Sequence, residues 1–562
     1  MPAGPTPRQR APDPILSRHP YAAEAAVIWV VVFVVGILAM GLAPPFVTWD
    51  EMFYIVYGLN HTEWYATLNR DSFSREGIEA FWRGGSEHPP LFPLAIGVMH
   101  RALAGRPTLM GPPGREPAED APPGDAINPI AARGAGVVEY AFLAMAVFLF
   151  TAGRWGRWAG RLAAVSLVAM PRVFAHGQVA AGDLPTALVW FLSVWAFVRA
   201  LERPGIGREV LSGMTFGAAL LTKINAVFIP VILVPWALMA WRRRAIRPLL
   251  ITCGLGALLF VAGWPWMWID TFHHVGGYLR RGTERQPIFV YYLGRAWRDI
   301  DVPAHYPLVM CLATVPVGVL AGAAWGAADG LRRNGRRALT ALLLANLLGP
   351  LAIFGLPWVP VYDGVRLFLH VLPFAAVLGG AGGVAAMRWL ARRTSSRTAR
   401  WTVMAVAALQ IAPTLATLPL GLSYYGGLVG GPWGASALGF EPTYWGDTMD
   451  PVLMQRLQAA VPEGSRVAVF HIPARQIFPY YESQFGRRGL VLTPYEPPGA
   501  RGAPFDYLVV NCRKGYFDDP VWGLYRTGTP LVERRHPFFR GVPLCRVYDV
   551  RGWTRQPETD TP

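Results

Sequence analysis

Four carboxylates stand at the ends of apolar segments, where a side chain can meet both buried groups and water. Asp50 and Glu51 follow the first apolar segment, Glu87 precedes a His-Pro-Pro-Leu run, and Asp183 opens the segment DLPTALVWFL. Ionised groups near a bilayer are costly, so acids kept there are candidates for function. The alternative is that they are helix N-terminal acids, which capping and the helix dipole favour. A catalytic interpretation selects Asp50, Glu51 and Asp183, because a positioned carboxylate can take a proton from an attacking hydroxyl.

Cations occupy similar positions. Lys223 ends an apolar segment in LLTKINA, Arg366 begins another, and the stretch 268–305 interleaves arginines with aromatic residues. Snorkelling to lipid headgroups explains such side chains, but a basic, aromatic-lined pocket would also bind the phosphate of a lipid. The candidate substrate-binding residues are Glu87, His88, Lys223, Arg280, Arg281, Tyr291, Tyr292 and Arg366.

Metal and nucleotide motifs are missing from the sequence. No His-Glu-x-x-His or comparable spacing occurs, and four cysteines are too few for a Cys-rich site. A divalent metal held by distant residues such as Glu87, Asp183 and His273 or His274 stays open. A serine nucleophile elbow, a Walker loop and a dinucleotide-binding glycine motif are also absent, which argues against hydrolase, ATPase and nucleotide-sugar chemistry.

The elements that must position these residues are apolar. Of the 562 residues, 53% are hydrophobic and only 16% are charged, against about 25% charged in a typical soluble domain. The net charge of +16 comes from arginine clusters between apolar segments, which indicates membrane topology rather than nucleic-acid binding.

Residues 25–43 are uncharged and long enough to span a bilayer. About eleven such segments end near residue 421, which predicts an all-α polytopic bundle with juxtamembrane helices. The segment 89–104 is short, and placing it on the outer face as a re-entrant or juxtamembrane helix leaves most arginines cytoplasmic. Residues 1–24 are then a cytoplasmic tail, and 25–421 form the membrane domain with outer loops 44–135 and 268–305.

Residues 422–562 change character. Three runs rich in branched and aromatic residues read as strands, and 450–460 reads as a helix. A small extracytoplasmic α/β domain follows from this pattern. Cys512 and Cys545 lie on or just after two of the strands, and both a disulfide and two buried free thiols are open. The predicted strands are Arg466–His471, Phe505–Asn511 and Pro543–Val550.

Four motifs together resemble the phospholipid-carrier-dependent glycosyltransferases of the GT-C type, which include dolichyl-phosphate-mannose protein mannosyltransferases and the bacterial lipid A aminoarabinose transferase. They are Trp-Asp-Glu at 49–51, Glu-His-Pro-Pro-Leu at 87–91, Gly-Asp-Leu-Pro-Thr at 182–186 and Leu-Leu-Thr-Lys at 220–223. The resemblance covers about residues 25–375.

The resemblance implies inverting transfer of a sugar from a polyprenyl-phosphate donor to a lipid, glycan or protein hydroxyl at the outer face of a bacterial cytoplasmic membrane. It places Asp50 as general base beside Glu51, and Asp183 in a supporting role. His88 departs from the aminoarabinose branch, which has Lys there, so the donor sugar, hexose or pentose, stays open. No metal or soluble nucleotide is required, and no nucleic-acid partner is expected.

Two other classes remain open. A lipid-linked saccharide flippase would place ionisable residues at the middle of its spans, often in repeated halves, whereas here they stand at one end and no repeat is seen. A non-catalytic membrane protein that binds cell-wall polymer through its tail would leave the acids unexplained.

Overall fold

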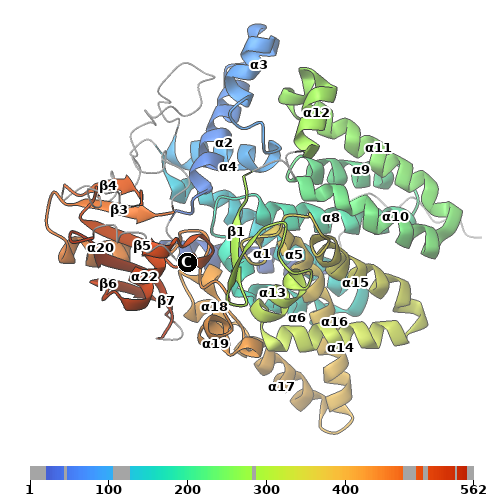
Figure 1. The fold of residues 1–562 in the computed structure, drawn as a ribbon. Helices are drawn as coiled ribbons and strands as arrows, with labels where there is room; N and C mark the ends of the chain where they lie inside the picture. Colours follow the sequence, from blue (N-terminus) through green and yellow to red (C-terminus); the bar gives the residue numbers. More distant parts are fainter. Residues whose placement is uncertain are drawn as a thin grey trace, which may run out of the picture.

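The computed structural model describes residues 20–42, 47–105, 127–280, 286–471, 489–497, 504–537 and 541–553. It is mostly helical, and a small sheet near the C-terminus lies to one side of the helices (Figure 1). This agrees with the predicted helical bundle followed by a compact α/β region.

Six helical stretches of the described chain are long and apolar enough to cross a membrane, and a bent pair of helices meeting at 115° makes seven if it is one span. The expected number of about eleven spans is therefore not confirmed. The six are Ala22–Leu42 (α1), Pro129–Trp155 (α5), Asp183–Glu202 (α8), Ile224–Ala262, Asn334–Phe354 (α15) and Arg366–Ala391; the bent pair is Tyr306–Thr314 (α13) with Val317–Arg332 (α14).

Other apolar segments form helices that are shorter than expected. The segment 160–176 is split by Pro171 into α6 (Arg157–Val168) and α7 (Pro171–His176), and α9 (Ile206–Leu220) has only 15 residues. At about 1.5 Å per residue such helices do not reach across a hydrocarbon core of about 30 Å. The stretch from Ile224 consists of η3 (Ile224–Val227), α10 (Phe228–Trp241), η4 (Arg242–Ala245) and α11 (Ile246–Ala262).

A layer of short helices carries the first acidic motif. α2 (Glu51–Ala66) packs on α4 (Leu91–Ala104), the 14-residue helix in the segment expected to be juxtamembrane. A Cβ atom added at Gly97 would lie 2.1 Å from the carbonyl oxygen of Gly58, so the two backbones approach too closely for any side chain. Near the starts of the two helices, the ring of Tyr54 packs against the rings of Phe92 and His88, at 5.0 and 5.1 Å between centroids, so the packed pair places Asp50 close to His88.

The C-terminal region contains a five-stranded sheet in the order β4-β3-β5-β7-β6. β3 pairs in parallel with β4 and β5, and β7 pairs antiparallel with β5 and β6. The three predicted strands and the predicted helix are confirmed, and β4 and β6 are additional. Cys512 and Cys545 are buried free thiols. The strands are β3 (Arg466–Phe470), β4 (Val491–Pro494), β5 (Tyr507–Asn511), β6 (Val532–Arg535) and β7 (Pro543–Asp549), with α20 (Pro451–Ala460) and α22 (Asp519–Thr527).

The stretch 268–305 ends in a hairpin. Strands β1 (Phe289–Tyr292) and β2 (Arg295–Arg298) pair antiparallel and precede α13. The remaining elements are α3 (Arg75–Trp82), α12 (Thr271–Arg280), α16 (Leu372–Ala391), α17 (Ser396–Leu409), α18 (Ala412–Ala416), α19 (Gly431–Ala437) and the short 3-10 helices η1 (Asp71–Phe73), η5 (Pro265–Trp268), η6 (Arg366–Val371), η7 (Gly421–Ser423), η8 (Gly427–Val429) and η11 (Lys514–Tyr516).

Candidate active site

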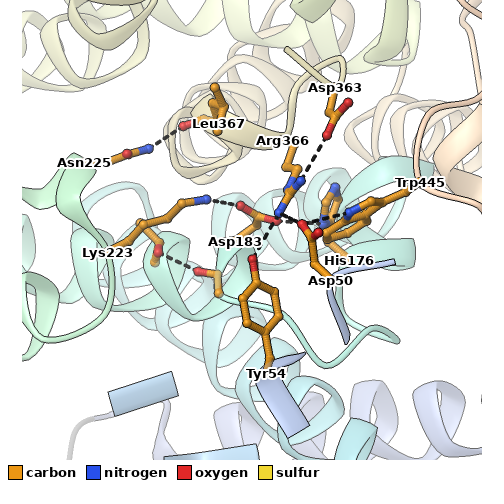
Figure 2. A network of polar contacts seen from close by, with 12 residues as sticks. Asp50, Tyr54, His176, Asp183, Lys223, Asn225, Asp363, Arg366, Leu367 and Trp445 are labelled. Carbon is orange, nitrogen blue, oxygen red and sulfur yellow. Dashed lines mark hydrogen bonds and ion pairs between the residues drawn. The ribbon is translucent and has the colours of Figure 1, made fainter. Parts of the chain in front are cut away.

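Arg366, at the start of η6, is the centre of a buried polar cluster (Figure 2). Its Nε lies 3.1 Å from Oδ2 of Asp183, its Nη1 lies 3.0 Å from Oδ2 of Asp363, and its Nη2 donates to Asp50. The Arg366 side chain is only 7% exposed. Acids more than a hundred residues apart in the sequence therefore share one guanidinium, and Asp50 and Asp183 lie in the same site as the sequence predicts.

Lys223 supplies a second cation. Its Nζ donates to Oδ1 of Asp183, so Asp183 bridges Lys223 and Arg366. The segments that carry the two cations are joined because Nδ2 of Asn225 donates to the carbonyl oxygen of Leu367 at 2.6 Å. The imidazole of His176 lies nearby, with Nδ1 3.7 Å from Oδ2 of Asp183.

Asp50 is the cluster's most accessible acid, with 31% of its side chain exposed, against 1% for Asp183 and 4% for Asp363. The indole of Trp445 donates to its Oδ2 at 3.1 Å. Burial raises the pKa of the Asp50 carboxyl, but the charge of Arg366 and the hydrogen bonds from Trp445 and Arg366 outweigh burial and lower it. Asp50 is therefore an ionised carboxylate that an incoming group can reach.

Asp363 extends the cluster to the C-terminal region. Its Oδ1 accepts from Nη2 of Arg513 at 2.9 Å, while Oδ2 accepts from Arg366. The cluster thus alternates three carboxylates with three cations, which is the arrangement that buried charges require. Asp363, Trp445 and Arg513 were not among the candidates selected from the sequence. Asp363 stands three residues before Arg366, which is a usable signal, whereas nothing local distinguishes Trp445 or Arg513.

Glu51 has different partners from Asp50. Its carboxylate accepts two hydrogen bonds of 2.7 Å from Arg133 and further bonds from the backbone N–H groups of Thr48 and Ala180. The Glu51 and Arg133 side chains are 0% and 2% exposed. Glu51, one of the catalytic candidates selected from the sequence, lies in a separate ion pair that joins α2, α5 and the segment before α8.

His88 and Glu87 lie at the edge of the site. The His88 ring packs edge-on against Tyr54 at 5.1 Å between centroids, and Tyr54 contacts Arg366 through its hydroxyl at 3.3 Å. Burial lowers the pKa of His88 to about 4, so the ring is neutral at neutral pH. His88 is thus placed to donate or accept a hydrogen bond but adds no cation. Glu87 is exposed.

The aromatic residues of the loop at 268–305 lie elsewhere. Tyr292 is buried against Tyr306 and Phe440, and Tyr291 contacts Trp522 of α22. Arg280 is exposed at the end of α12, and Arg281 lies outside the described residues. The hairpin therefore packs between the helices and the C-terminal region. Tyr291 and Tyr292 are not brought to the Arg366 cluster.

The described residues include no group of three or more His, Cys, Asp or Glu side chains placed to hold a metal ion. Each acid of the Arg366 cluster instead has an arginine partner, and Asp183 a lysine as well. The cluster is suited to binding an anion in place of one carboxylate.

Residues 130–268 match the family model described as dolichyl-phosphate-mannose-protein mannosyltransferase. This stretch contains the motifs around Asp183 and Lys223, so the resemblance inferred from the sequence is confirmed there. No curated protein sequence matches the chain.

Three solved structures are similar over most of the chain. ArnT from Cupriavidus metallidurans in the apo state aligns with a TM-score of 0.46 and 13% identity, covering 95% of this chain and 98% of ArnT. ArnT bound to undecaprenyl phosphate aligns with a TM-score of 0.45 and 12% identity over 96% and 100% of the two chains. The oligosaccharyltransferase AglB from Archaeoglobus fulgidus, in complex with an inhibitory peptide and a dolichol-phosphate, aligns with a TM-score of 0.44 and 12% identity over 89% and 73%.

Proposed function

We propose that the chain is a membrane glycosyltransferase that moves a sugar from a polyprenyl-phosphate donor to an acceptor hydroxyl, with inversion at the anomeric carbon. The observation that carries the proposal is the Arg366 cluster, where the reachable carboxylate of Asp50 lies beside two cations suited to phosphate, Arg366 and Lys223. The family match over residues 130–268 supports the same class of reaction.

The carboxylate and the cations of the cluster have different roles in the proposed reaction. Asp50 takes the proton of the acceptor hydroxyl while the acceptor oxygen bonds to the anomeric carbon, and base catalysis of this kind contributes about 10²–10⁴-fold. The bond from that carbon to the phosphate oxygen breaks on the opposite side, which inverts the configuration. The leaving polyprenyl phosphate gains negative charge, which Arg366 and Lys223 stabilise. The proposed reaction needs neither a metal ion nor a soluble nucleotide.

Donor binding also prepares the base. In the structure Arg366 and Lys223 are both paired with carboxylates, so a donor phosphate must share them. Drawing Arg366 toward phosphate weakens its hold on Asp50 and makes that carboxylate a stronger base. We therefore expect the donor to bind before the acceptor. The acceptor is a lipid, glycan or protein hydroxyl on the extracytoplasmic side of a bacterial cytoplasmic membrane.

Mass spectrometry of polyprenyl-phosphate sugars in a deletion strain tests the proposal whichever sugar the donor carries. We expect the strain to accumulate the donor, the wild-type gene to clear it, and Asp50→Asn to leave it in place although the protein is made. Asp301→Asn is the matched control, because Asp301 forms an exposed ion pair with Arg298. Clearance by Asp50→Asn would remove the assignment.

Purified protein in liposomes separates transfer from transport. Given the accumulated lipid as donor and membranes of the deletion strain as acceptor, a transferase forms a new glycosidic product and releases polyprenyl phosphate. Movement of the intact lipid-linked sugar across the bilayer without such a product would show a flippase instead.

A further inference from the structure

The carboxyl-terminal ends of the parallel strands in the C-terminal sheet face the Arg366 cluster. The parallel strands β3 and β5 end there, and the residues that follow them, His471 and Arg513, both contact the ring of Trp49, beside Asp50. The carboxyl ends of parallel strands are where α/β sheets form ligand sites. Here the side chains at those strand ends meet a site that is built by helices outside the C-terminal region.

Arg513 is fixed in place from several directions. Its side chain is 5% exposed, and its guanidinium lies 4.9 Å from the ring centroid of Trp49 and 4.7 Å from that of Tyr516. The backbone N–H of Gly515 donates to the buried carboxylate of Glu441 at 2.9 Å, which anchors the segment. The backbone segment that carries Arg513 is therefore held rigidly, and so is the ion pair that Arg513 forms with Asp363.

Asp363 divides its two oxygens between two arginines, Oδ1 to Arg513 and Oδ2 to Arg366. It adopts a left-handed backbone conformation, with φ of 56°, which a residue with a side chain keeps only when its surroundings hold it. Without Arg513, Asp363 would have only Arg366 to neutralise it. Arg366 could follow Asp363 only by weakening its contacts to Asp50 and Asp183, because a guanidinium offers its donors in a fixed plane.

We infer that Arg513 is a positioning residue of the proposed active site: it holds Asp363, and through Asp363 it fixes the Arg366 guanidinium against Asp50 and Asp183. The inference rests on the proposed function. It makes the C-terminal α/β region part of the site, because its contact with the site orients the group that binds phosphate.

The test compares Arg513→Gln and Arg513→Lys with wild type in liposomes, using lipid extracted from the deletion strain as donor and its membranes as acceptor. We expect Arg513→Gln to lower the maximal rate on the order of 10²-fold, the effect of about 1 Å of misplacement. Arg513→Lys keeps the positive charge but loses the planar guanidinium with its several N–H donors, so we expect a rate between those of wild type and Arg513→Gln. Lys514→Gln is the control, because Lys514 packs on the rings of Tyr291 and Tyr525.

The pH profile supplies a readout that mere destabilisation would not move. Asp50 faces Arg366, Trp445, His88 and Tyr54, with Asp183 and Arg513 farther away. If Arg366 turns toward Asp363 in Arg513→Gln, the acid limb of the rate profile moves to higher pH by about one unit or more. The limb of Lys514→Gln stays where it is in the wild type.

A double-variant cycle tests the route through Asp363. Adding Arg513→Gln to Asp363→Asn should lower the rate little further, because the group through which Arg513 acts has lost its charge. Full additivity, or a wild-type rate and acid limb in Arg513→Gln, would overturn the inference. If Arg513→Gln does not fold, a wild-type rate and acid limb in Arg513→Lys would do the same. Inactive wild-type protein would instead count against the proposed function.

Discussion

Asp50 and Glu51 are adjacent, yet the structure gives them different surroundings. Asp50 lies just before α2 and is partly exposed at the Arg366 cluster, whereas Glu51, the first residue of α2, is fully buried against Arg133. Side chains at neighbouring positions of a helix start point about 100° apart, so both cannot face the same group. Substitutions of Asp50 and of Glu51 should therefore reduce activity for different reasons.

We expect Glu51→Gln to reduce stability rather than chemistry. Breaking a buried ion pair by removing one partner costs about 3–5 kcal/mol, because the other charge is left uncompensated. Thermal unfolding in detergent should show a marked fall in melting temperature. Combining Glu51→Gln with Arg133→Met should recover part of it, since no lone charge remains. A stable Glu51→Gln protein without activity would instead support the catalytic role.

The pH dependence of the rate follows from the state of Asp50. Its active form is the carboxylate, so activity that depends on it is present above the pKa and lost as pH falls through it. Since Arg366 and Trp445 lower that pKa below its ordinary value before the donor binds, we expect kcat/KM for the donor to show no acid limb from Asp50 between about pH 5 and about pH 7. His88, with a pKa of about 4, adds none there. Initial rates in liposomes would show this, and a midpoint inside that range would contradict it.

The sequence predicted the helical half of the cluster but not its other half. Asp50, Asp183, Lys223 and Arg366 stand at ends of apolar segments, and topology alone predicts that such ends share one face. Trp445 and Arg513 reach the cluster through tertiary packing across more than a hundred residues. No periodicity or spacing encodes that contact. Aromatic and basic composition fits hairpin packing as well as phosphate binding, which is why Tyr291 and Tyr292 could be selected from the sequence although they pack away from the cluster.

At the scale of elements, the crossing of α2 and α4 determines where Asp50 and His88 lie. We expect Gly97→Val to destabilise the protein by about 1–3 kcal/mol or more, because the atom in its way is a backbone oxygen that cannot rotate aside. Pushing the helices apart also separates Asp50 from His88, so transfer should fall more than stability. Activity per folded molecule, measured with the melting temperature, checks both effects.

Gly254→Ala, compared with Gly97→Ala, is the matched control for that substitution, because both add only a Cβ atom. Gly254 lies in α11, and a Cβ atom there meets nothing within 4 Å. It should leave both activity and melting temperature near wild type. Equal behaviour of the two variants would show that the α2–α4 crossing has no special role.

Helix lengths explain why the described residues contain fewer candidate spans than the sequence predicts. Hydropathy identifies apolar stretches, but it does not show where a proline or a positive φ interrupts the helix. Pro171 divides one predicted span, and Arg242, with φ of 52°, follows the end of α10. The buried, broken helices near the site are where irregular backbone is tolerated in a membrane protein, because protein groups satisfy its hydrogen bonds.

Over the whole molecule, the carboxylate cluster lies at one end of α8, and arginines at the end of α5 and the start of α6 lie at the other end. α8 begins with Asp183 in the cluster and ends with Glu202, which pairs with Arg154 near the end of α5 at 2.6 Å. Glu24, near the start of α1, pairs with Arg157 at 3.0 Å at that same far end. The positive-inside rule therefore predicts that the far end is cytoplasmic and that the cluster faces outward.

Reporter fusions test this orientation. Alkaline phosphatase, which is active only outside the cytoplasm, should be active when fused after Trp553, because the C-terminal sheet packs at the cluster end through Arg513 and Trp49. Fused after Ser395, between α16 and α17, it should be inactive, since α16 leads away from Arg366 to Arg388 and Arg392. A green fluorescent protein at the same two positions should give the reverse pattern. Phosphatase activity at Ser395 and fluorescence at Trp553 would put the cluster in the cytoplasm, where an acceptor on the outer surface could not reach Asp50.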